Sequence, residues 1–364
     1  MTGVRWIGAF LGLGFVVSTA VASGIDCLPH PLQLQRINRR IAGQVIDYTH
    51  NHGGDRRIWS NALQEKRDLY VYLPPHYQPE QKYPLLLWLH AAAHDEHEFL
   101  NSVVGLFDRA IQSGELPPLI IAAPDGSLPG RPSWTTAGSF FINTKAGAFE
   151  DFIMEDVWNF LMENFPIRPE REAHGLAGAS MGGFGAYNLA IKYPDRCKLV
   201  VGLFPALNLR WVDCHCRYRG NFDPCCWGWR TQLRPNELIG RIYLLPIRVK
   251  RLTDPLFGRG PEVIEAIARE NPIEMLEPYQ VEPSKFDMYI GYGGRDQLNV
   301  DAQVESFLYV ARRRGLDVHV WYDPRGRHDA ATGIRALPDM AEWLAQRLRP
   351  YTPPVEKLPA KECP

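Results

Sequence analysis

Residues 174–189 read HGLAGASMGGFGAYNL. The first residues are mostly apolar, as in a buried strand, and the second half carries good helix formers with apolar residues at helical spacing. A serine between two glycines at such a strand-to-helix junction is typical of a nucleophile elbow, because side chains at Gly178 and Gly182 would collide with neighbouring backbone. The pattern predicts that Ser180 is a catalytic nucleophile and that the N–H of Met181 faces a developing oxyanion. The alternative is a glycine-rich turn with an idle serine.

The composition is that of an ordinary globular protein. The 364 residues are 45% hydrophobic, 11% aromatic and 22% charged, which is ample for a large core. The formal net charge of −1 gives no reason to expect nucleic acid or an anionic membrane as a partner. The sequence predicts no oligomeric state.

The N-terminus has the features of a signal peptide. Arg5 supplies a positive charge, residues 6–17 are apolar, and Ala20-Val21-Ala22 offers small residues for cleavage. The apolar run is short for a membrane span, so we expect removal of residues 1–22 and export to the periplasm or the medium, rather than a stable membrane span. An uncleaved anchor is the alternative.

Strand and helix patterns alternate after an N-terminal extension at 23–39. We expect an antiparallel pair at 40–48 and 67–73, strands at 85–90, 119–123, 174–177, 199–204, 286–291 and 318–322, and helices at 96–113, 149–164, 184–192, 300–314 and 338–348. The alternation predicts an α/β fold with a mostly parallel sheet that helices cover on both faces. One domain at 40–350 accounts for it, and 351–364 is a proline-rich tail.

Two further side chains follow predicted strands. Asp296 lies in a glycine-rich loop after the strand at 286–291, and His328 lies in the loop after the last strand. Active residues of parallel sheets gather at the carboxyl ends of strands, and the order Ser180, Asp296, His328 is that of α/β-hydrolases. A serine needs an imidazole to remove its proton, and the imidazole needs a carboxylate to fix its tautomer.

Other residues compete for these roles. Asp296 has the alternative of an ordinary turn aspartate, and two more acids, Asp323 and Asp329, lie too close in sequence to His328 to reach its far nitrogen easily. The competing histidines are His90, His94, His97 and His174. The run from His94 to His97 resembles a metal-ligand set, but a polar loop with Asp95 as a helix cap explains it more simply, and we predict no metal there.

Several motifs resemble one family of esterases among the α/β-hydrolases. It contains esterase D-like enzymes, feruloyl and acetyl-xylan esterases and bacterial mycolyltransferases. The similarity rests on YPLLLWLH at 83–90, PDG at 124–126 followed by Ser133-Trp134, FEDF at 149–152, GASMGGFGA at 178–186 and GRHD at 326–329. It covers about 40–348. The resemblance implies hydrolysis or transfer of carboxylic esters through an acyl-serine, with no cofactor, and a small-molecule or carbohydrate ester as substrate.

One departure from the family concerns the oxyanion loop. Where the resemblance implies glycine after His90, this chain has Ala91-Ala92-Ala93. If the loop needs a positive φ at the first position, Ala91 is strained and oxyanion stabilisation is weakened. Ala91 and Ala92 are the candidate second donors.

An insert at about 206–275 interrupts the sheet where the fold commonly carries a cap. The insert contains His215 and four cysteines, which are Cys214, Cys216, Cys225 and Cys226. Because export makes disulfides possible, we favour two disulfides among these cysteines, and a zinc knot is the alternative. Cys197 reads as buried, and Cys27 and Cys363 as a candidate terminal bridge. The aromatic residues form either a small core of the cap or a substrate pocket, and we expect Trp134, Trp227 and Trp229 to contact substrate.

Two classes of function remain open. The first is an exported serine esterase, with an acyltransferase of the mycolyltransferase kind as a close variant. The second is a non-catalytic binding protein whose oxyanion loop has decayed. The three residues of the Ser-Asp-His set favour the first class, and the alanine run favours the second.

Overall fold

The computed structural model describes residues 30–133, 138–242 and 245–353. Its centre is an eight-stranded sheet in the order β1-β4-β6-β5-β9-β10-β15-β16. β4 runs antiparallel to both of its neighbours, and the other neighbouring pairs are parallel. The strands are β1 (Gln44–Tyr48), β4 (Leu69–Leu73), β5 (Leu85–Leu89), β6 (Ile120–Pro124), β9 (His174–Ala179), β10 (Leu199–Leu203), β15 (Asp287–Gly293) and β16 (Val318–Asp323).

Burial on both faces explains the strand sequences. Every residue of β4, β5, β6, β9 and β10 is buried, as expected for strands that helices cover on both sides. β16 lies at an edge and alternates between half-buried and exposed residues. The predicted antiparallel pair and the predicted parallel strands are therefore confirmed, with ends that move by a few residues.

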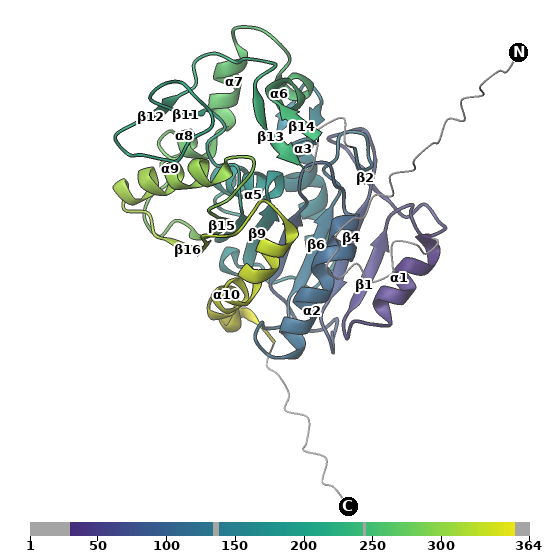
Figure 1. The fold of residues 1–364 in the computed structure, drawn as a ribbon. Helices are drawn as coiled ribbons and strands as arrows, with labels where there is room; N and C mark the ends of the chain where they lie inside the picture. Colours follow the sequence, from purple (N-terminus) through teal and green to yellow (C-terminus); the bar gives the residue numbers. More distant parts are fainter. Residues whose placement is uncertain (1–29, 134–137, 243–244, 354–364) are drawn as a thin grey trace, which may run out of the picture.

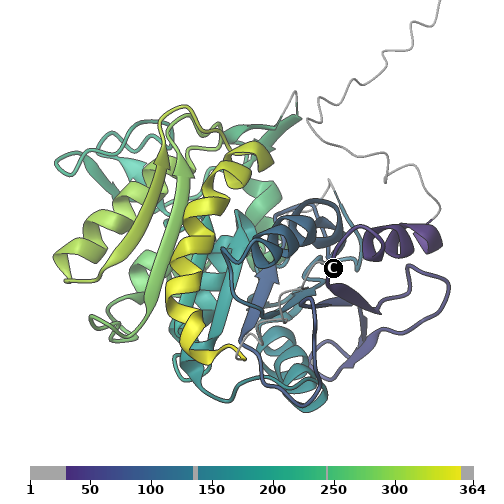
Figure 2. The ribbon, with the colours of Figure 1, turned by 90° about the horizontal axis from the view of Figure 1, so that it is seen from below.

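The connections place helices on both faces. The chain moves from β5 outward to β6, then back across to β9, β10, β15 and β16. Since parallel crossovers are right-handed, this reversal puts α2 on one face and α4, α5 and α9 on the other (Figures 1 and 2). The helices that cover the sheet are α2 (Val104–Gln112), α3 (Phe149–Asp151), α4 (Trp158–Asn164), α5 (Met181–Lys192), α9 (Val300–Arg313) and α10 (Ala330–Leu348). A π-helical segment, Phe99–Val103, precedes α2, and another, Phe152–Val157, joins α3 to α4.

Helix α10 begins earlier than the sequence suggested. The prediction started it at Pro338, but the helix begins at Ala330 and Pro338 lies inside it. Asp329 caps it: its Oδ1 accepts the backbone N–H of Thr332 at 2.9 Å. The cap fixes the start of the helix, and the helix continues through the proline.

Short elements complete the described part of the chain. The predicted N-terminal extension contains a helix, α1. These elements are α1 (His30–Asn38), the hairpins β2 (Ile58–Ser60) with β3 (Glu65–Arg67) and β7 (Asn143–Thr144) with β8 (Gly147–Ala148), and single turns at Arg171–Ala173 and Arg349–Tyr351. Within the described ranges, no helix is both long and apolar enough to cross a bilayer.

The insert is more regular than its sequence indicated. It gathers at one end of the sheet, at the upper left of Figure 1. Trp211, Tyr218, Ile239, Ile247 and Val249 form a second small core there, together with Ala302 of α9. The insert's elements are β11 (Trp211–Asp213), β12 (Trp227–Trp229), β13 (Leu238–Ile242), β14 (Leu245–Arg248), α6 (Val249–Phe257), α7 (Val263–Glu270) and α8 (Pro272–Met275).

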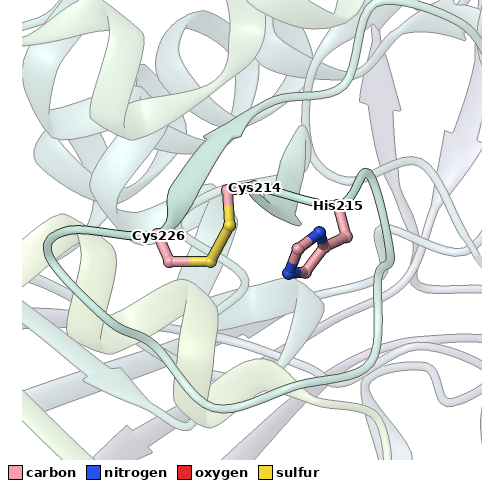
Figure 3. A group of neighbouring side chains, drawn as sticks. All are labelled: Cys214, His215 and Cys226. Atoms are coloured by element: carbon pink, nitrogen blue, oxygen red, sulfur yellow. A yellow bond between two sulfur atoms is a disulfide. The ribbon is translucent and has the colours of Figure 1, made fainter.

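One disulfide joins the two strands of the first insert hairpin. Asp213 pairs with Trp227 in the antiparallel register, so Cys214 and Cys226 fall opposite each other, with Cα atoms 4.7 Å apart, and their sulfurs are bonded. Figure 3 shows His215 beside this bridge. Sulfurs bonded to each other are not free thiolates for zinc, so the bridge replaces the zinc knot.

The second predicted insert disulfide is absent from the described residues. Cys216 and Cys225 are exposed thiols, and Cys197 is buried as expected. The prediction of two bridges was wrong because only one cysteine pair lies in register across the hairpin. Cys27 and Cys363, the proposed terminal pair, lie outside the described residues, as do the predicted signal peptide and most of the tail.

Candidate active site

Ser180 occupies a tight turn between β9 and α5. Its φ of 55° and ψ of −112° are unusual for a residue with a side chain, and such strain is typical of functional sites. A Cβ on Gly182 would fall on the carbonyl oxygen of Leu89, and one on Gly178 would lie 2.5 Å from the same oxygen. Both glycines are therefore sterically required, as the sequence indicated. The turn stands beside the end of β5, where the strand order reverses and where open α/β sheets bind ligands.

The structure brings Ser180, His328 and Asp296 into one chain of hydrogen bonds. His328 Nε2 lies 2.8 Å from Ser180 Oγ, and His328 Nδ1 lies 2.7 Å from Asp296 Oδ2. The side chain of Asp296 is 1% exposed and that of His328 9%. In this arrangement the imidazole donates from Nδ1 to the carboxylate and accepts the serine proton at Nε2.

Backbone contacts hold the acid and the histidine in place. Asp296 Oδ1 accepts the N–H of Leu298 at 2.8 Å, which leaves Oδ2 for the imidazole. Gln297 holds the backbone of His328 on both sides: its Oε1 accepts the His328 N–H and its Nε2 donates to the His328 carbonyl. Gln297 was not predicted from the sequence, although its place directly after Asp296 is a signal for it.

The competing residues have other partners. Asp323 accepts from the backbone of Arg325 and pairs with Arg335, and Asp329 caps α10. His174 is buried against Trp158 as a packed residue, as expected.

His90 joins the ends of two strands. Its Nδ1 donates to the carbonyl of Ala91, and its Nε2 accepts the N–H of Gly126. Because both nitrogens are engaged, His90 acts as a brace between the loops that follow β5 and β6.

The loop after β5 contains an N–H, that of Ala92, that has no hydrogen-bond acceptor among the described residues. The N–H of Ala91 donates to Glu98 Oε2 at 2.8 Å and is therefore occupied. Among the hydrogen bonds of the described residues, neither the Ala92 N–H nor the Met181 N–H has an acceptor. Ala92 and Met181 therefore stay the candidate oxyanion donors, and Glu98 anchors the loop, a role that was not predicted from the sequence.

The expected strain at Ala91 is wrong. The positive φ falls two residues later, at Ala93, with φ of 68°. The N–H of His94 donates to the Ala91 carbonyl at 3.3 Å, so Ala93 takes the third position of a four-residue turn, where type II turns need a positive φ. The alanine run therefore does not distort the Ala91 peptide itself.

A pair of glycine substitutions tests this placement. Ala93→Gly relieves the left-handed strain, whereas Ala91→Gly only adds freedom to the unfolded chain, an effect that both variants share. We expect Ala93→Gly to exceed Ala91→Gly in free energy of unfolding by on the order of 1 kcal/mol. Urea denaturation of both variants measures the difference, and equal stabilities would contradict the turn described above.

A buried group of acids lies behind this loop. Carboxylate oxygens of Asp68, Glu96 and Asp125 lie within 4.8 Å of one another, and so do ligand atoms of Asp95, Glu96 and His97. As expected for a cap, Asp95 Oδ1 accepts the N–H of His97. Burial, and then the neighbouring carboxylates, raise the pKa of Glu96 well above its usual range.

The Glu96 pKa gives a pH-dependent prediction. Because the folded-state pKa is raised, ionised Glu96 destabilises the fold, and stability is lost as pH rises from the unfolded value through the folded one. Glu96→Gln keeps an oxygen for the Asn51 amide, which donates to Glu96 Oε1. We expect its Tm to exceed wild type by about 2–4 °C at pH 8 and to match it near pH 4. Thermal scans at both values check this, with exposed Glu115→Gln as control; a variant that is less stable at pH 8 would contradict it.

The predicted substrate tryptophans have different surroundings. Trp134 lies outside the described residues. Trp227 stacks on Trp211 and contacts Phe222, within the small core that was the alternative for these rings. Trp229 is 37% exposed and packs on the edge of Trp227. A substrate role for either ring stays a prediction.

This chain is similar to known proteins in sequence and in fold. It is 32% identical to an S-formylglutathione hydrolase of Bos taurus over 174 residues, which are 43% of this chain and 58% of that protein. A structure titled ferulic acid esterase matches with a TM-score of 0.61 and 17% identity, over 85% of this chain and 99% of that one. An S-formylglutathione hydrolase from Agrobacterium tumefaciens matches with a TM-score of 0.59 and 16% identity, over 85% and 96%. The curated relatives are thus matched over less than two thirds of their length, while the structures show the same fold.

The family follows from a match that spans most of the chain. The model of the Esterase family, described as "Putative esterase", matches residues 60–343. This range contains the elbow, the loop after β5, and the loops that carry the acid and the histidine. The chain belongs to the Esterase family of α/β-hydrolases.

Proposed function

We propose that this protein is a serine hydrolase of carboxylic esters, with Ser180 as nucleophile, His328 as general base and acid, and Asp296 as the carboxylate that orients the imidazole. The observation that carries the proposal is the hydrogen-bonded chain from Ser180 Oγ through His328 to Asp296. Membership of the Esterase family supports it.

The geometry suits the formation of an acyl-serine. Ser180 Oγ attacks the ester carbonyl carbon while its proton moves to His328 Nε2, and the carbonyl electron pair moves onto oxygen. The N–H groups of Met181 and Ala92 would donate to this oxyanion, at a helix N-terminus that favours negative charge. When the oxyanion collapses, the C–O bond to the alcohol breaks and His328 gives its proton to the alcohol oxygen.

Release of the acyl group repeats these steps with water. His328 takes a proton from water, the water oxygen bonds to the acyl carbon, and the bond to Ser180 Oγ breaks as the serine regains a proton. The chemistry is the same if a sugar hydroxyl replaces water, as in the acyltransferase alternative. The unengaged Ala92 N–H supports a catalytic site over a non-catalytic binding protein.

Small carboxylic esters, including carbohydrate-linked ones, are the proposed substrates. The similar structures carry the names ferulic acid esterase and S-formylglutathione hydrolase, which support an ester substrate of this kind. No group of this site requires a cofactor in the steps above.

We also propose that the protein is exported. The sequence of residues 1–22 and the Cys214–Cys226 disulfide support this, because disulfides persist in oxidising compartments. Fractionation of cells that express the full chain, with mass spectrometry of the mature N-terminus, tests it. A cytoplasmic protein that begins at Met1 would overturn the proposal.

A fluorophosphonate probe tests the esterase proposal directly. The probe should label wild-type protein at Ser180, as mapped by peptide mass spectrometry, and the same protein should hydrolyse p-nitrophenyl acetate. Folded protein that is neither labelled nor active would refute the proposal. The acyltransferase would be favoured by a different result. In that case the probe labels Ser180, the protein hydrolyses no ester when sugar is absent, and it transfers the acyl group to a sugar that is added.

A further inference from the structure

An apolar pocket lies between the insert and the body of the protein. Its cavity volume is about 60 Å³, which is room for about four or five water molecules or for a short hydrocarbon chain. Phe140 and Ile142, from the loop before β7, form one side, and side chains of the insert, including Val249, Leu252 and Ile267, form the rest. None of the three proposed catalytic residues lines it, so it is a separate chamber.

The pocket offers almost no free hydrogen-bonding group. Three of its lining side chains are polar, and each has a partner within the protein. The Tyr218 hydroxyl donates to the Leu298 carbonyl, Arg230 is paired with Glu237, and Thr253 Oγ1 donates to the carbonyl of Val249. A sugar, a peptide or a charged group would leave its own polar atoms unpaired there, and so the lining fits a hydrocarbon.

Both sides of the pocket are tied to the reacting groups. The Phe140 ring meets Phe184 edge-on at 5.2 Å, four residues after Ser180 on the helix of the elbow. On the other side, Tyr218 bonds to Leu298, the residue whose N–H holds Asp296. The residues that line the chamber therefore contact the helix of the elbow on one side and the loop of the acid on the other.

Strain in the loop before β7 also points to a ligand. Phe140 and Phe141 both have a positive φ, of 55° and 59°. Ser139 holds the loop, because its Oγ donates to the Gly126 carbonyl and accepts the N–H of Phe141. Consecutive left-handed residues with large side chains cost energy and persist where they position groups for a ligand. Both rings belong to the main core, and Phe140 also lines the pocket.

We propose that this pocket receives the hydrocarbon chain of the acyl group, so that the protein prefers esters of medium-chain fatty acids over acetyl esters. This inference rests on the proposed esterase function. The acyl group stays on Ser180 through both halves of the reaction, whereas the alcohol must leave, and most of the pocket's side chains are buried. A largely buried apolar pocket therefore suits the part of the ester that is retained.

The test is a chain-length series of p-nitrophenyl esters from acetate to octanoate. A buried methylene is worth about fourfold in kcat/KM, so octanoate should exceed acetate by tenfold or more. Leu252→Asn places a polar amide in a half-buried wall position and should lower the octanoate-to-acetate ratio about tenfold, with acetate hydrolysis within twofold of wild type. Val249→Phe fills the pocket and should act in the same way. Leu32→Asn, an exposed leucine of α1, is the matched control and should change nothing.

The outcomes separate the pocket from the esterase activity. Equal kcat/KM for acetate and octanoate, or a ratio that Leu252→Asn leaves unchanged, would overturn the pocket assignment while the esterase stands. If Leu252→Asn instead impairs octyl acetate, the pocket holds the alcohol and the proposal is wrong. If no ester is hydrolysed, the esterase function fails, and calorimetric binding of octanoate to wild type but not to Leu252→Asn still tests the pocket.

Discussion

Replacing Ser180 by alanine should lower kcat for p-nitrophenyl acetate by about four to six powers of ten, and His328→Ala should do the same. The reason is the hydrogen-bonded chain: Ser180 Oγ has no nucleophilic strength until His328 Nε2, 2.8 Å away, takes its proton. Any remaining rate would come from substrate binding and from the Met181 and Ala92 N–H groups. Steady-state kinetics measure the loss, and circular dichroism checks that each variant is folded.

The double variant gives the decisive control. Since serine and histidine act as a unit, Ser180→Ala with His328→Ala should be no slower than either single variant. His94→Ala removes an exposed competing histidine and should leave kcat within twofold of wild type. A folded Ser180→Ala protein that keeps more than one hundredth of wild-type kcat would contradict the assignment of the nucleophile.

The fold and the grouping of Ser180, Asp296 and His328 could be predicted because local sequence encodes them. Gly178 and Gly182 mark the elbow since no other residue fits against the backbone of Leu89. Asp296 and His328 could be placed because each follows an apolar run that reads as a parallel strand, and the carboxyl ends of such strands meet at one sheet edge. Topology brings them to the same sheet edge, and the contacts of Leu298 and Gln297 hold them at hydrogen-bond distance.

The oxyanion loop could not be predicted at the same detail. The position of positive φ depends on which peptide closes the turn, and the bond from His94 N–H to the Ala91 carbonyl places it at Ala93. Glu98 decides which N–H is occupied, through a contact seven residues along the chain. Neither contact leaves a periodic pattern in the sequence.

The structure of the insert could not be predicted from the sequence for a related reason. Its strands are three to five residues long, too short for a clear alternation of apolar and polar residues. The sequence positions of the four cysteines do not specify which of them pair. The register of the hairpin selects Cys214 and Cys226. The wall of the pocket combines residues from separate parts of the insert with Phe140. A single sequence contains no pattern that predicts such long-range contacts.

Asp296→Asn should lower kcat about ten-thousandfold while KM changes little, although the variant is nearly isosteric. The Leu298 N–H donates to Asp296 Oδ1, and it needs an oxygen there. The asparagine must therefore keep its oxygen toward Leu298 and turn its NH₂ toward His328 Nδ1. An imidazole that accepts at Nδ1 carries its proton on Nε2, which then donates to Ser180 Oγ and cannot take the serine proton.

The competing acids provide matched controls for this argument. Asp323→Asn and Asp329→Asn make the same chemical change at the acids that flank His328 in sequence, and both should keep kcat within tenfold of wild type. Asparagine caps helices about as well as aspartate, so Asp329→Asn should also preserve the start of α10. Proton NMR of the imidazole N–H should show its resonance near Asp296 in wild type and lose it in Asp296→Asn. If Asp323→Asn matched the loss of Asp296→Asn, the acid of the site would be Asp323, and the geometry at Leu298 would have no catalytic meaning.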